Sequence, residues 1–371
     1  MTDIGVYIHI PFCLKKCGYC DFVSFPYNRK VMATYVDHLV EEIRLTESGP
    51  YRIKTLFFGG GTPSLLGLDE LARIMAAIKE KYIFADHAEV TLESNPGTWT
   101  LENAEGYKAL GINRISMGVQ SLDEDLLQVL GRQHNVDQVY ESMALLRQAG
   151  FDNINLDLMF ALPGQKIDQL VSTLEKLVAL GPEHISAYSL TYEEGTPFYD
   201  HIEDQADQEL DRTMYHQVQR FLLEAGYDQY EISNFSKPGY ACQHNLVYWK
   251  RKPYMAFGLN SHACINEMRL ANTADLQTYY QMIDKGILPI VERTPLTIED
   301  QAFEDIMLNL RLNEGLDVLA YNKTYACDLL ADYKDEIKDL VDQGLLRLND
   351  SHLVLTAKGM DLSNQVFIKF L

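Results

Sequence analysis

Basic residues are scarce in this sequence. It holds 32 Lys and Arg against 53 Asp and Glu, which gives a formal net charge of −21 at pH 7. A protein that binds nucleic acid needs a basic surface to meet the phosphates, so this balance argues against a nucleic-acid binder. The same charge argues against docking on an anionic membrane surface by general charge attraction.

Long apolar runs are missing as well. No stretch approaches the roughly 18 uninterrupted apolar residues of a transmembrane helix, so no membrane span is predicted. The opening "MTDIGVYIHI" lacks a basic segment followed by an apolar run and a small-residue cleavage site, so no signal peptide is predicted. We therefore expect a cytoplasmic protein. In that compartment cysteines stay reduced, and a tight group of thiols indicates metal or redox chemistry rather than disulfides.

The chain does contain a regular alternation of short apolar runs and longer amphipathic stretches. With 371 residues and 47% hydrophobic content it has room for a sizeable core and about two domains. Strands are predicted at 6–10, 53–60, 88–96, 114–120, 153–160 and 184–190, with helices at 31–47, 68–82, 101–111, 138–150 and 169–181. Six such units predict an α/β fold with a parallel sheet, either a partial TIM-like (β/α)6 barrel or a doubly wound open sheet.

The sequence suggests three parts. The barrel is predicted at 1–237 and an aromatic, His-rich connecting segment without a helical period at 238–296. A mostly helical C-terminal domain is predicted at 297–371, with helices at 298–312 and 333–345 and a hairpin at 345–359. Helices followed by a small hairpin suggest a winged-helix-like unit, and its acidity argues against DNA binding.

Several polar or glycine-rich positions fall at the ends of predicted strands. They are the "GGGTP" at 59–63, Glu93 in "LESNP", Gln120 in "MGVQ" and Asp157 in "NLDL". Each alone also fits a turn or a helix cap. Barrel enzymes place their chemistry on the loops after the strands, so the four together indicate one site.

Three of the six cysteines are crowded: Cys13, Cys17 and Cys20 lie within eight positions. Structural zinc sites and most iron–sulfur clusters use four protein ligands, so three adjacent thiols leave one coordination position open for a small ligand. The alternatives are three thiols in an ordinary loop, or a zinc site completed by a distant residue such as His9.

This spacing, with Tyr19 before the third cysteine, resembles the 4Fe–4S signature of radical S-adenosylmethionine (SAM) enzymes. In that superfamily the three thiolates hold three irons and SAM chelates the fourth. An electron from the cluster then cleaves SAM into methionine and a 5′-deoxyadenosyl radical. The "GGGTP" resembles the superfamily's glycine-rich SAM-binding loop, where glycine lets the backbone approach a ligand closely.

Further motifs narrow the resemblance. "YIHIPFCLKKCGYC", "SMGVQS", "LGRQH", "NLDLMFALPGQ" and "LNLRLNEGLD" are similar to the family of oxygen-independent coproporphyrinogen III dehydrogenase. The resemblance implies iron ligation by the three cysteines. It also implies SAM contacts from Tyr7, Tyr19, Gly60, Gly61, Thr62, Glu93, Gln120, Arg132 and Asp157.

Two departures separate this chain from the dehydrogenase itself. That enzyme has a further cysteine two residues after the third, where this chain has Phe22, and it has a long extension before the cluster. "CDF" and the later "HNLVYW" resemble instead the haem chaperone branch of the family, HemW. The branch implies a protein that binds haem and delivers it to haem-acceptor proteins, with an electron donor for its cluster and no coproporphyrinogen decarboxylation.

His244 opens the "HNLVYW" motif, whose histidine is implicated in haem binding in that branch. A neutral imidazole is a common axial ligand of haem iron, and Tyr and Trp can stack on the macrocycle. The alternative is a structural histidine within a packed aromatic cluster. Cys242 is expected to be a buried thiol, His9 to pack near the cluster, and His262 has no assigned role. Because the motif lies more than two hundred residues from the cysteines, it need not share their cofactor, and we expect haem binding by His244 to be separable from the cluster.

Three functions follow from these observations. The first is a haem chaperone with a radical SAM core, capable of SAM cleavage, and the second is a coproporphyrinogen III dehydrogenase or another radical SAM enzyme. The third is a structural scaffold that has lost its chemistry. Phe22 favours the first over the second, and the complete cysteine and glycine motifs argue against the third.

Overall fold

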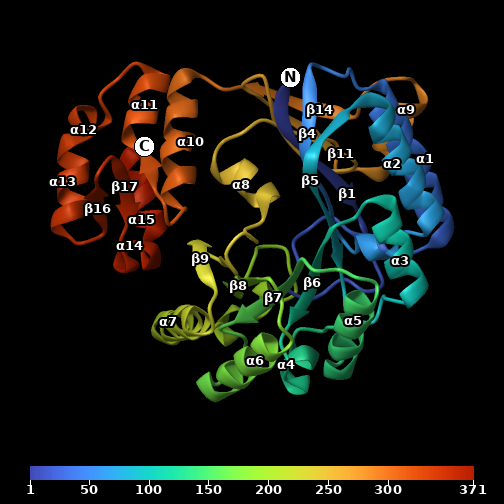
Figure 1. Ribbon diagram of the computed structural model, residues 1–371, viewed down its shortest axis with the longest axis horizontal. Coiled ribbons are helices and arrows are strands. Elements are labelled where there is room, and N and C mark those ends of the chain that lie inside the picture. The colour runs from blue at the N-terminus through green and yellow to red at the C-terminus, as the bar shows by residue number, and fades with distance from the viewer.

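The computed structural model describes residues 1–371 and contains one large sheet of twelve strands (Figure 1). Its centre is six parallel strands that neighbour one another in chain order: β1 (Thr2–Ile10), β4 (Tyr51–Gly60), β5 (Ile83–Ser94), β6 (Arg114–Gln120), β7 (Ile154–Phe160) and β8 (His184–Ser189). A doubly wound sheet reverses its strand order at a switch point, and this one does not. The predicted partial (β/α)6 barrel is therefore confirmed.

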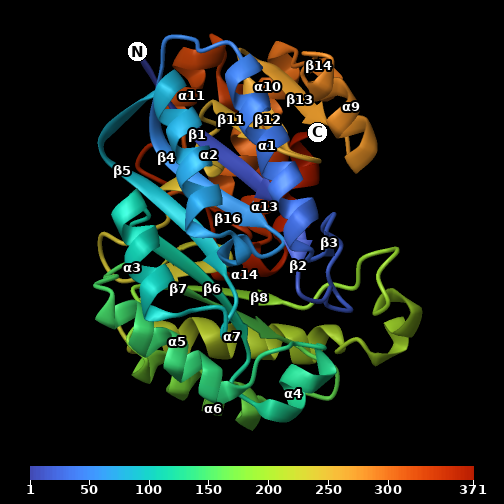
Figure 2. The ribbon, with the colours of Figure 1, turned by 90° about the vertical axis from the view of Figure 1, so that its right-hand side faces the viewer.

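Helices cover the outer side of these strands, because right-handed crossovers that always advance in one direction place every helix on the same face. They are α1 (Arg29–Leu45), α2 (Leu68–Lys81), α3 (Leu101–Leu110), α5 (Val136–Gln148), α6 (Ile167–Ala179) and α7 (Gln208–Glu224), seen along the outside in Figure 2. The loops after the strands carry β2 (Phe12–Cys13), η1 (Pro63–Leu65), β3 (Phe25–Pro26), α4 (Glu124–Val129) and η2 (Tyr199–Asp204). No helix is long and apolar enough to span a membrane.

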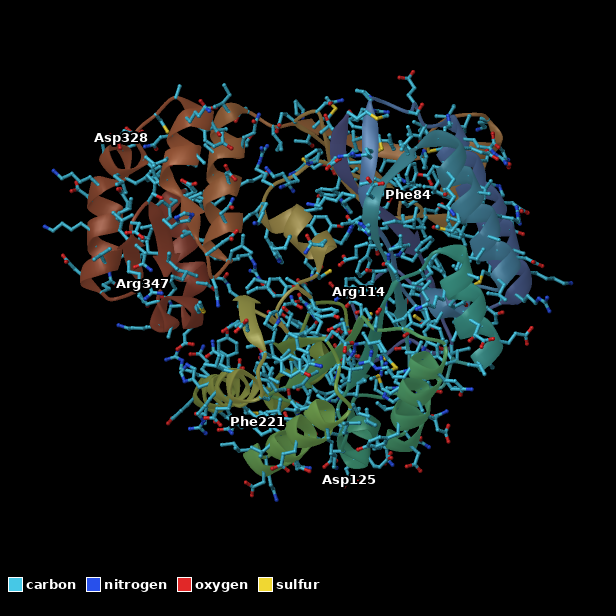
Figure 3. The ribbon with its side chains drawn as sticks, in the orientation of Figure 1. Phe84, Arg114, Asp125, Phe221, Asp328 and Arg347 are labelled. Atoms are coloured by element: carbon cyan, nitrogen blue, oxygen red, sulfur yellow. The ribbon has the colours of Figure 1, made fainter.

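The strands pack an apolar outer face against the helices and turn a polar inner face into the barrel. A cluster of 54 buried residues forms the apolar core. On the inner face Thr55, Arg114, Asn155 and His184 are almost completely buried, and Arg114 lies in the interior in Figure 3. Because side chains alternate along a strand, this polar inner layer continues toward the strand ends, where the predicted site residues lie.

Further strands extend both edges of the six-stranded parallel sheet. On one side β8 pairs with β10 (Asn234–Ser236) and then β9 (Asp228–Glu231). On the other, β1 pairs in parallel with β11 (Tyr254–Phe257), followed by β12 (His262–Ile265), β13 (Met268–Asn272) and β14 (Ile290–Pro295). The segment 238–296 therefore contributes four strands to the main sheet, together with the helix α9 (Leu276–Asp284). The predicted boundaries of the segment stay a prediction.

The same segment contains α8 (Gln243–Trp249), a helix that its sequence does not announce by a helical period. This helix contacts β1 and β4 on one side and α10 (Ile298–Leu310) on the other, between the barrel and the C-terminal helices in Figure 1. The Glu89 carboxylate of β5 anchors its start, because it accepts hydrogen bonds from the backbone N–H groups of Gln243 and His244 at 3.1 and 3.0 Å.

The C-terminal part has its own core of 14 buried residues. Its helices are α10, α11 (Val318–Tyr325), α12 (Leu329–Asp332), α13 (Lys334–Asp342), α14 (Ala357–Asp361), α15 (Ser363–Phe367) and η3 (Ile368–Phe370). The predicted hairpin is present as β16 (Leu346–Asn349) and β17 (His352–Leu355), with β15 (Leu316–Asp317) pairing on β17. The helices and hairpin predicted for this part are confirmed.

Candidate functional site

The three crowded cysteines lie on the cysteine loop, residues 13–24, which follows β1. The loop is closed at its base because Phe12 and Cys13 in β2 pair with Phe25 and Pro26 in β3. Within it, the N–H of Cys20 donates to the carbonyl of Cys17 at 3.2 Å. The three side chains are partly exposed. Burial raises the pKa of the Cys13 and Cys20 thiols, so in the absence of a bound metal both are neutral.

These thiols open into one cavity at the carboxyl ends of the strands, which we call the cysteine cavity. All the residues predicted for the cluster and SAM except Tyr7 line it: Cys13, Cys17, Tyr19, Cys20, Gly60, Gly61, Thr62, Glu93, Gln120, Arg132 and Asp157. The fold thus brings together residues from the cysteine loop and four strands. The polar and glycine-rich positions at the strand ends predicted such a single site.

The three thiols do not form a site for a single metal ion. No group of three or more His, Cys, Asp or Glu side chains is close enough to hold one ion. The zinc alternative completed by His9 is therefore not supported, and His9 instead hydrogen-bonds the carbonyl of Val23 at 3.3 Å. Thiolates of an iron–sulfur cluster each bind a different iron, so they stand farther apart than ligands of one ion. Three thiols on one cavity fit that arrangement.

The glycine loop after β4 packs directly on the cysteine loop. Gly60 has φ of +113°, and a Cβ there would lie 2.6 Å from the His9 ring. A Cβ on Gly61 would lie 2.6 Å from the carbonyl oxygen of Phe12. Thr62 then donates from its hydroxyl to the sulfur of Cys13 at 3.7 Å. Only glycine allows this close approach, so the loop both borders the cavity and positions the first thiol.

Two carboxyl groups line the cavity from β5 and β7, the strands on either side of β6. Glu93 accepts a hydrogen bond from the N–H of Gly60 at 3.0 Å, and Asp157 accepts one from the Asn155 amide at 2.6 Å. Burial, together with the charge of Asp157, raises the pKa of Glu93 to about 8. Burial also raises the pKa of Asp157. Buried carboxyls with raised pKa values gain stability from a cationic ligand, such as one bearing an ammonium or sulfonium group.

Arg132 connects the strand ends to the cysteine loop. One terminal nitrogen donates to the Asn95 side chain at 2.5 Å and to the Gly118 carbonyl at 2.6 Å. The other lies 3.6 Å from the sulfur of Cys17 and 3.4 Å from the hydroxyl of Tyr19. Its Nε is buried without a partner. Arg132 therefore orders the loop around the second thiol and retains one free donor.

Sequence reasoning missed two residues of the cavity. Asn95 donates to the Thr62 hydroxyl at 2.9 Å and so joins the glycine loop to Arg132. The Tyr188 hydroxyl donates to the Gln120 side chain at 3.2 Å from the end of β8. Asn95 stands two positions after Glu93 in the quoted "LESNP", so its position at the same strand end could have identified it as a residue of the cavity. Nothing in the sequence identifies Tyr188 as one.

His244 lies inside the molecule, with 1% of its surface exposed. Its Nδ1 is 2.8 Å from the hydroxyl of Thr55, and its Nε2 is 2.9 Å from the hydroxyl of Tyr248. The ring stacks on Phe57 with centroids 5.0 Å apart. Burial lowers its pKa to about 3, with Arg114 adding to the effect, so the imidazole is neutral. Both ring nitrogens are occupied by hydrogen bonds in this arrangement.

A second cavity, which we call the aromatic cavity, adjoins the first. It is lined by Tyr7, Phe22, Phe57, Gly60, Glu93, His244, Asn245 and Tyr248. Phe22, Gly60 and Glu93 line both cavities. The "HNLVYW" site and the cysteine site therefore share a wall, and the separability of haem binding from the cluster stays a prediction.

The remaining histidine and cysteine near the motif have simple roles. Cys242 is completely buried, and its sulfur donates to Glu89 at 3.6 Å. Burial raises the pKa of its thiol to about 12, as expected for a structural cysteine. His262 is exposed on β12, away from either cavity.

Comparison with known proteins agrees with this geometry. The Radical SAM superfamily model matches residues 7–177, and the HemN C-terminal domain model matches residues 296–362. The chain is 35% identical to the haem chaperone HemW of Bacillus subtilis (strain 168), over 99% of both chains. It is 32% identical to the haem chaperone HemW of Escherichia coli (strain K12), over 100% of this chain and 99% of that one. The chain belongs to the HemW family. The predicted haem chaperone branch is confirmed.

A solved structure agrees with the fold. Coproporphyrinogen III oxidase (HemN) from Escherichia coli, a radical SAM enzyme, superposes with a TM-score of 0.88 over 100% of this chain and 90% of that one. At 23% identity this likeness shows the fold and nothing about the reaction. Relatives that cover the whole chain carry the HemW name, so the dehydrogenase alternative rests on the shared fold alone.

Proposed function

We propose that this protein is a haem chaperone that binds haem as cargo and passes it to haem-acceptor proteins. One observation carries the proposal: in a member of the HemW family, a cavity lined by three thiols shares a wall with a cavity lined by aromatic rings and His244. The first suits a radical SAM cofactor set and the second suits a flat apolar ligand.

The resident cofactors would be a 4Fe–4S cluster and SAM in the cysteine cavity. Cys13, Cys17 and Cys20 would hold the cluster, and the raised pKa values of Glu93 and Asp157 support a cationic ligand beside them. When bound, this pair supplies the one-electron chemistry of the superfamily.

The chain's own residues hold the SAM site in shape. Gly60 and Gly61 keep the wall close and free of side chains. Thr62 contacts the Cys13 thiol, and Arg132 contacts the Cys17 thiol. Polar partners for a ligand are also present in the lining, from Tyr19, Gln120 and the unpaired Nε of Arg132. Tyr7 lies on the aromatic side of the shared wall, next to Gly59.

Haem would enter from the aromatic cavity. Tyr7, Phe57 and Tyr248 offer apolar rings, and His244 offers the imidazole that suits haem iron once its Nε2 leaves Tyr248. The absence of disulfides among the six free cysteines supports work in the cytoplasm, where an electron donor and the acceptor proteins would meet it.

The test uses anaerobically reconstituted full-length protein. Haem is added to one sample, and coproporphyrinogen III with SAM and a reductant is added to another. We expect a stoichiometric Soret band and transfer of haem to apomyoglobin in the first sample, and no vinyl groups in the second. Vinyl formation without haem binding would show that the protein is a dehydrogenase and would overturn the proposal.

A further inference from the structure

Phe22 is the cysteine-loop aromatic that borders both cavities. Its backbone is tied to the cysteine loop, because its carbonyl accepts a hydrogen bond from Lys16 at 2.9 Å. Phe22 also lines the aromatic cavity together with residues of α8, and 60% of its surface is exposed.

An exposed phenylalanine beside a cavity of aromatic rings needs an explanation. The cysteine loop has ample polar residues, and Leu14 is equally exposed at 59%, but Leu14 lines only the cysteine cavity. An exposed apolar side chain indicates a ligand surface where it continues other apolar surface, and Phe22 does so with the aromatic rings of this cavity. At Phe22, the rings across the cavity indicate that the ligand is itself flat and apolar.

The size of the aromatic cavity agrees with a ligand that is only partly enclosed. The cavity has a volume of about 240 Å³ and would take one edge of a macrocycle between Tyr7, Phe57 and Tyr248. The rest of the ring would then lie outside, where the exposed face of Phe22 is available to stack on it. Partial enclosure also suits a cargo that must be released.

We propose that Phe22 is a haem-binding residue, whose ring stacks on the part of the macrocycle outside the aromatic cavity. This inference rests on the proposed function and deepens it, because it places the cargo against the loop that carries the three thiols. The backbone of residue 22 is tied to the cysteine loop and the ring serves the cargo, so the two roles separate on substitution.

The experiment compares three variants of the reconstituted protein: Phe22→Ala, Phe22→Trp and Ile83→Ala. Haem affinity is measured by Soret titration with hemin, and each sample is normalised to its iron content. Loss of an aromatic stacking partner is expected to weaken haem binding in Phe22→Ala roughly tenfold. Phe22→Trp keeps a flat ring and should restore most of the affinity. Ile83→Ala is the control for an equally exposed apolar residue, 58% exposed and in the lining of neither cavity, and should bind haem as wild type does.

Each outcome decides the matter. Weakening in Phe22→Ala alone, with recovery in Phe22→Trp, supports the inference. Wild-type affinity in Phe22→Ala overturns it while leaving the proposed function intact. Equal weakening in Phe22→Ala and Ile83→Ala also overturns it, because it would indicate a general effect of losing exposed apolar surface. Absence of haem binding by the wild-type protein overturns the proposed function and this inference together.

Discussion

The Nε2 atom of His244 lies 2.9 Å from the hydroxyl oxygen of Tyr248, one turn further along α8. This bond occupies the nitrogen that haem iron would need, while Thr55 occupies the other. Tyr248 also lines the aromatic cavity, so the same hydroxyl that blocks the imidazole faces the space where haem is proposed to bind. Haem ligation by His244 therefore requires Tyr248 to give up its partner.

This relationship predicts opposite effects for two substitutions. His244→Ala should weaken haem binding and shift the Soret band, because the axial nitrogen is removed. Tyr248→Phe should bind haem at least as tightly as wild type and up to about fivefold tighter, since ligation no longer costs a hydrogen bond worth about 1 kcal/mol. Soret titrations of both variants test this. If His244→Ala binds haem with the wild-type spectrum and affinity, His244 is a structural residue only.

Replacing Cys13, Cys17 and Cys20 together by Ala should abolish bound iron and the broad visible absorbance of the cluster, because no other residues of the cavity supply thiolates. Iron analysis after anaerobic reconstitution measures this. Cys327→Ser is the control, since that cysteine lies in the C-terminal domain and should keep wild-type iron. Full iron content in the triple variant would refute the cluster assignment.

Asp157→Ala should weaken SAM binding by about 1–3 kcal/mol, the usual cost of leaving buried polar groups without their partner. The reason is local: Asp157 is buried in the cysteine cavity, where it accepts from Asn155 and faces Glu93 across the ligand space. Calorimetric titration of SAM into the reconstituted protein provides the measurement. Asp152→Ala, an exposed carboxylate in the turn before the same strand, should leave the affinity unchanged. Equal affinities in both variants would remove Asp157 from the site.

The barrel was predictable because its signals are local. Each parallel strand is a short apolar run ended by glycine or a polar residue, and β6 coincides with the predicted run at 114–120. The cysteine cavity followed from the same reading, because parallel strands bring their carboxyl ends to one edge. That Glu93, Gln120 and Asp157 lie at one edge could be predicted without knowing any contacts between the strands.

The features that could not be predicted, namely α8, the surroundings of His244 and the contact of Tyr188, depend on packing between segments that are distant in the sequence. At seven residues α8 is too short for its aromatic sequence to show a helical period, and its start is held by Glu89 rather than by a local cap. Separation along the chain hid how near His244 lies to the cysteine cavity, because α8 returns into the barrel beside β4. Tyr188 was missed for the same reason: only the curvature of the sheet brings it to Gln120.

Glu42 on α1 shows how the segment after α8 is fixed to the barrel, and it predicts a pH dependence of stability. Its buried carboxyl accepts hydrogen bonds from Tyr279, Gly258 and Asn272 at 2.6, 2.8 and 2.7 Å. Burial raises its pKa to about 7, against the opposing effect of these donors. In the unfolded chain the carboxyl ionises near its ordinary pKa of 4.5.

Between pH 4.5 and about 7 the folded protein therefore holds a proton that the unfolded chain has lost. The stability contributed by the protonated group is complete below pH 4.5 and is lost as the pH rises through 7, a change on the order of 3 kcal/mol. Urea unfolding of wild type and Glu42→Gln across this window tests it, because the variant cannot ionise and should lose that part of the slope. Glu41→Gln, the exposed neighbour, should keep the wild-type slope. Identical slopes in wild type and Glu42→Gln would show that Glu42 is already ionised in the folded protein at low pH, held so by its three hydrogen-bond donors.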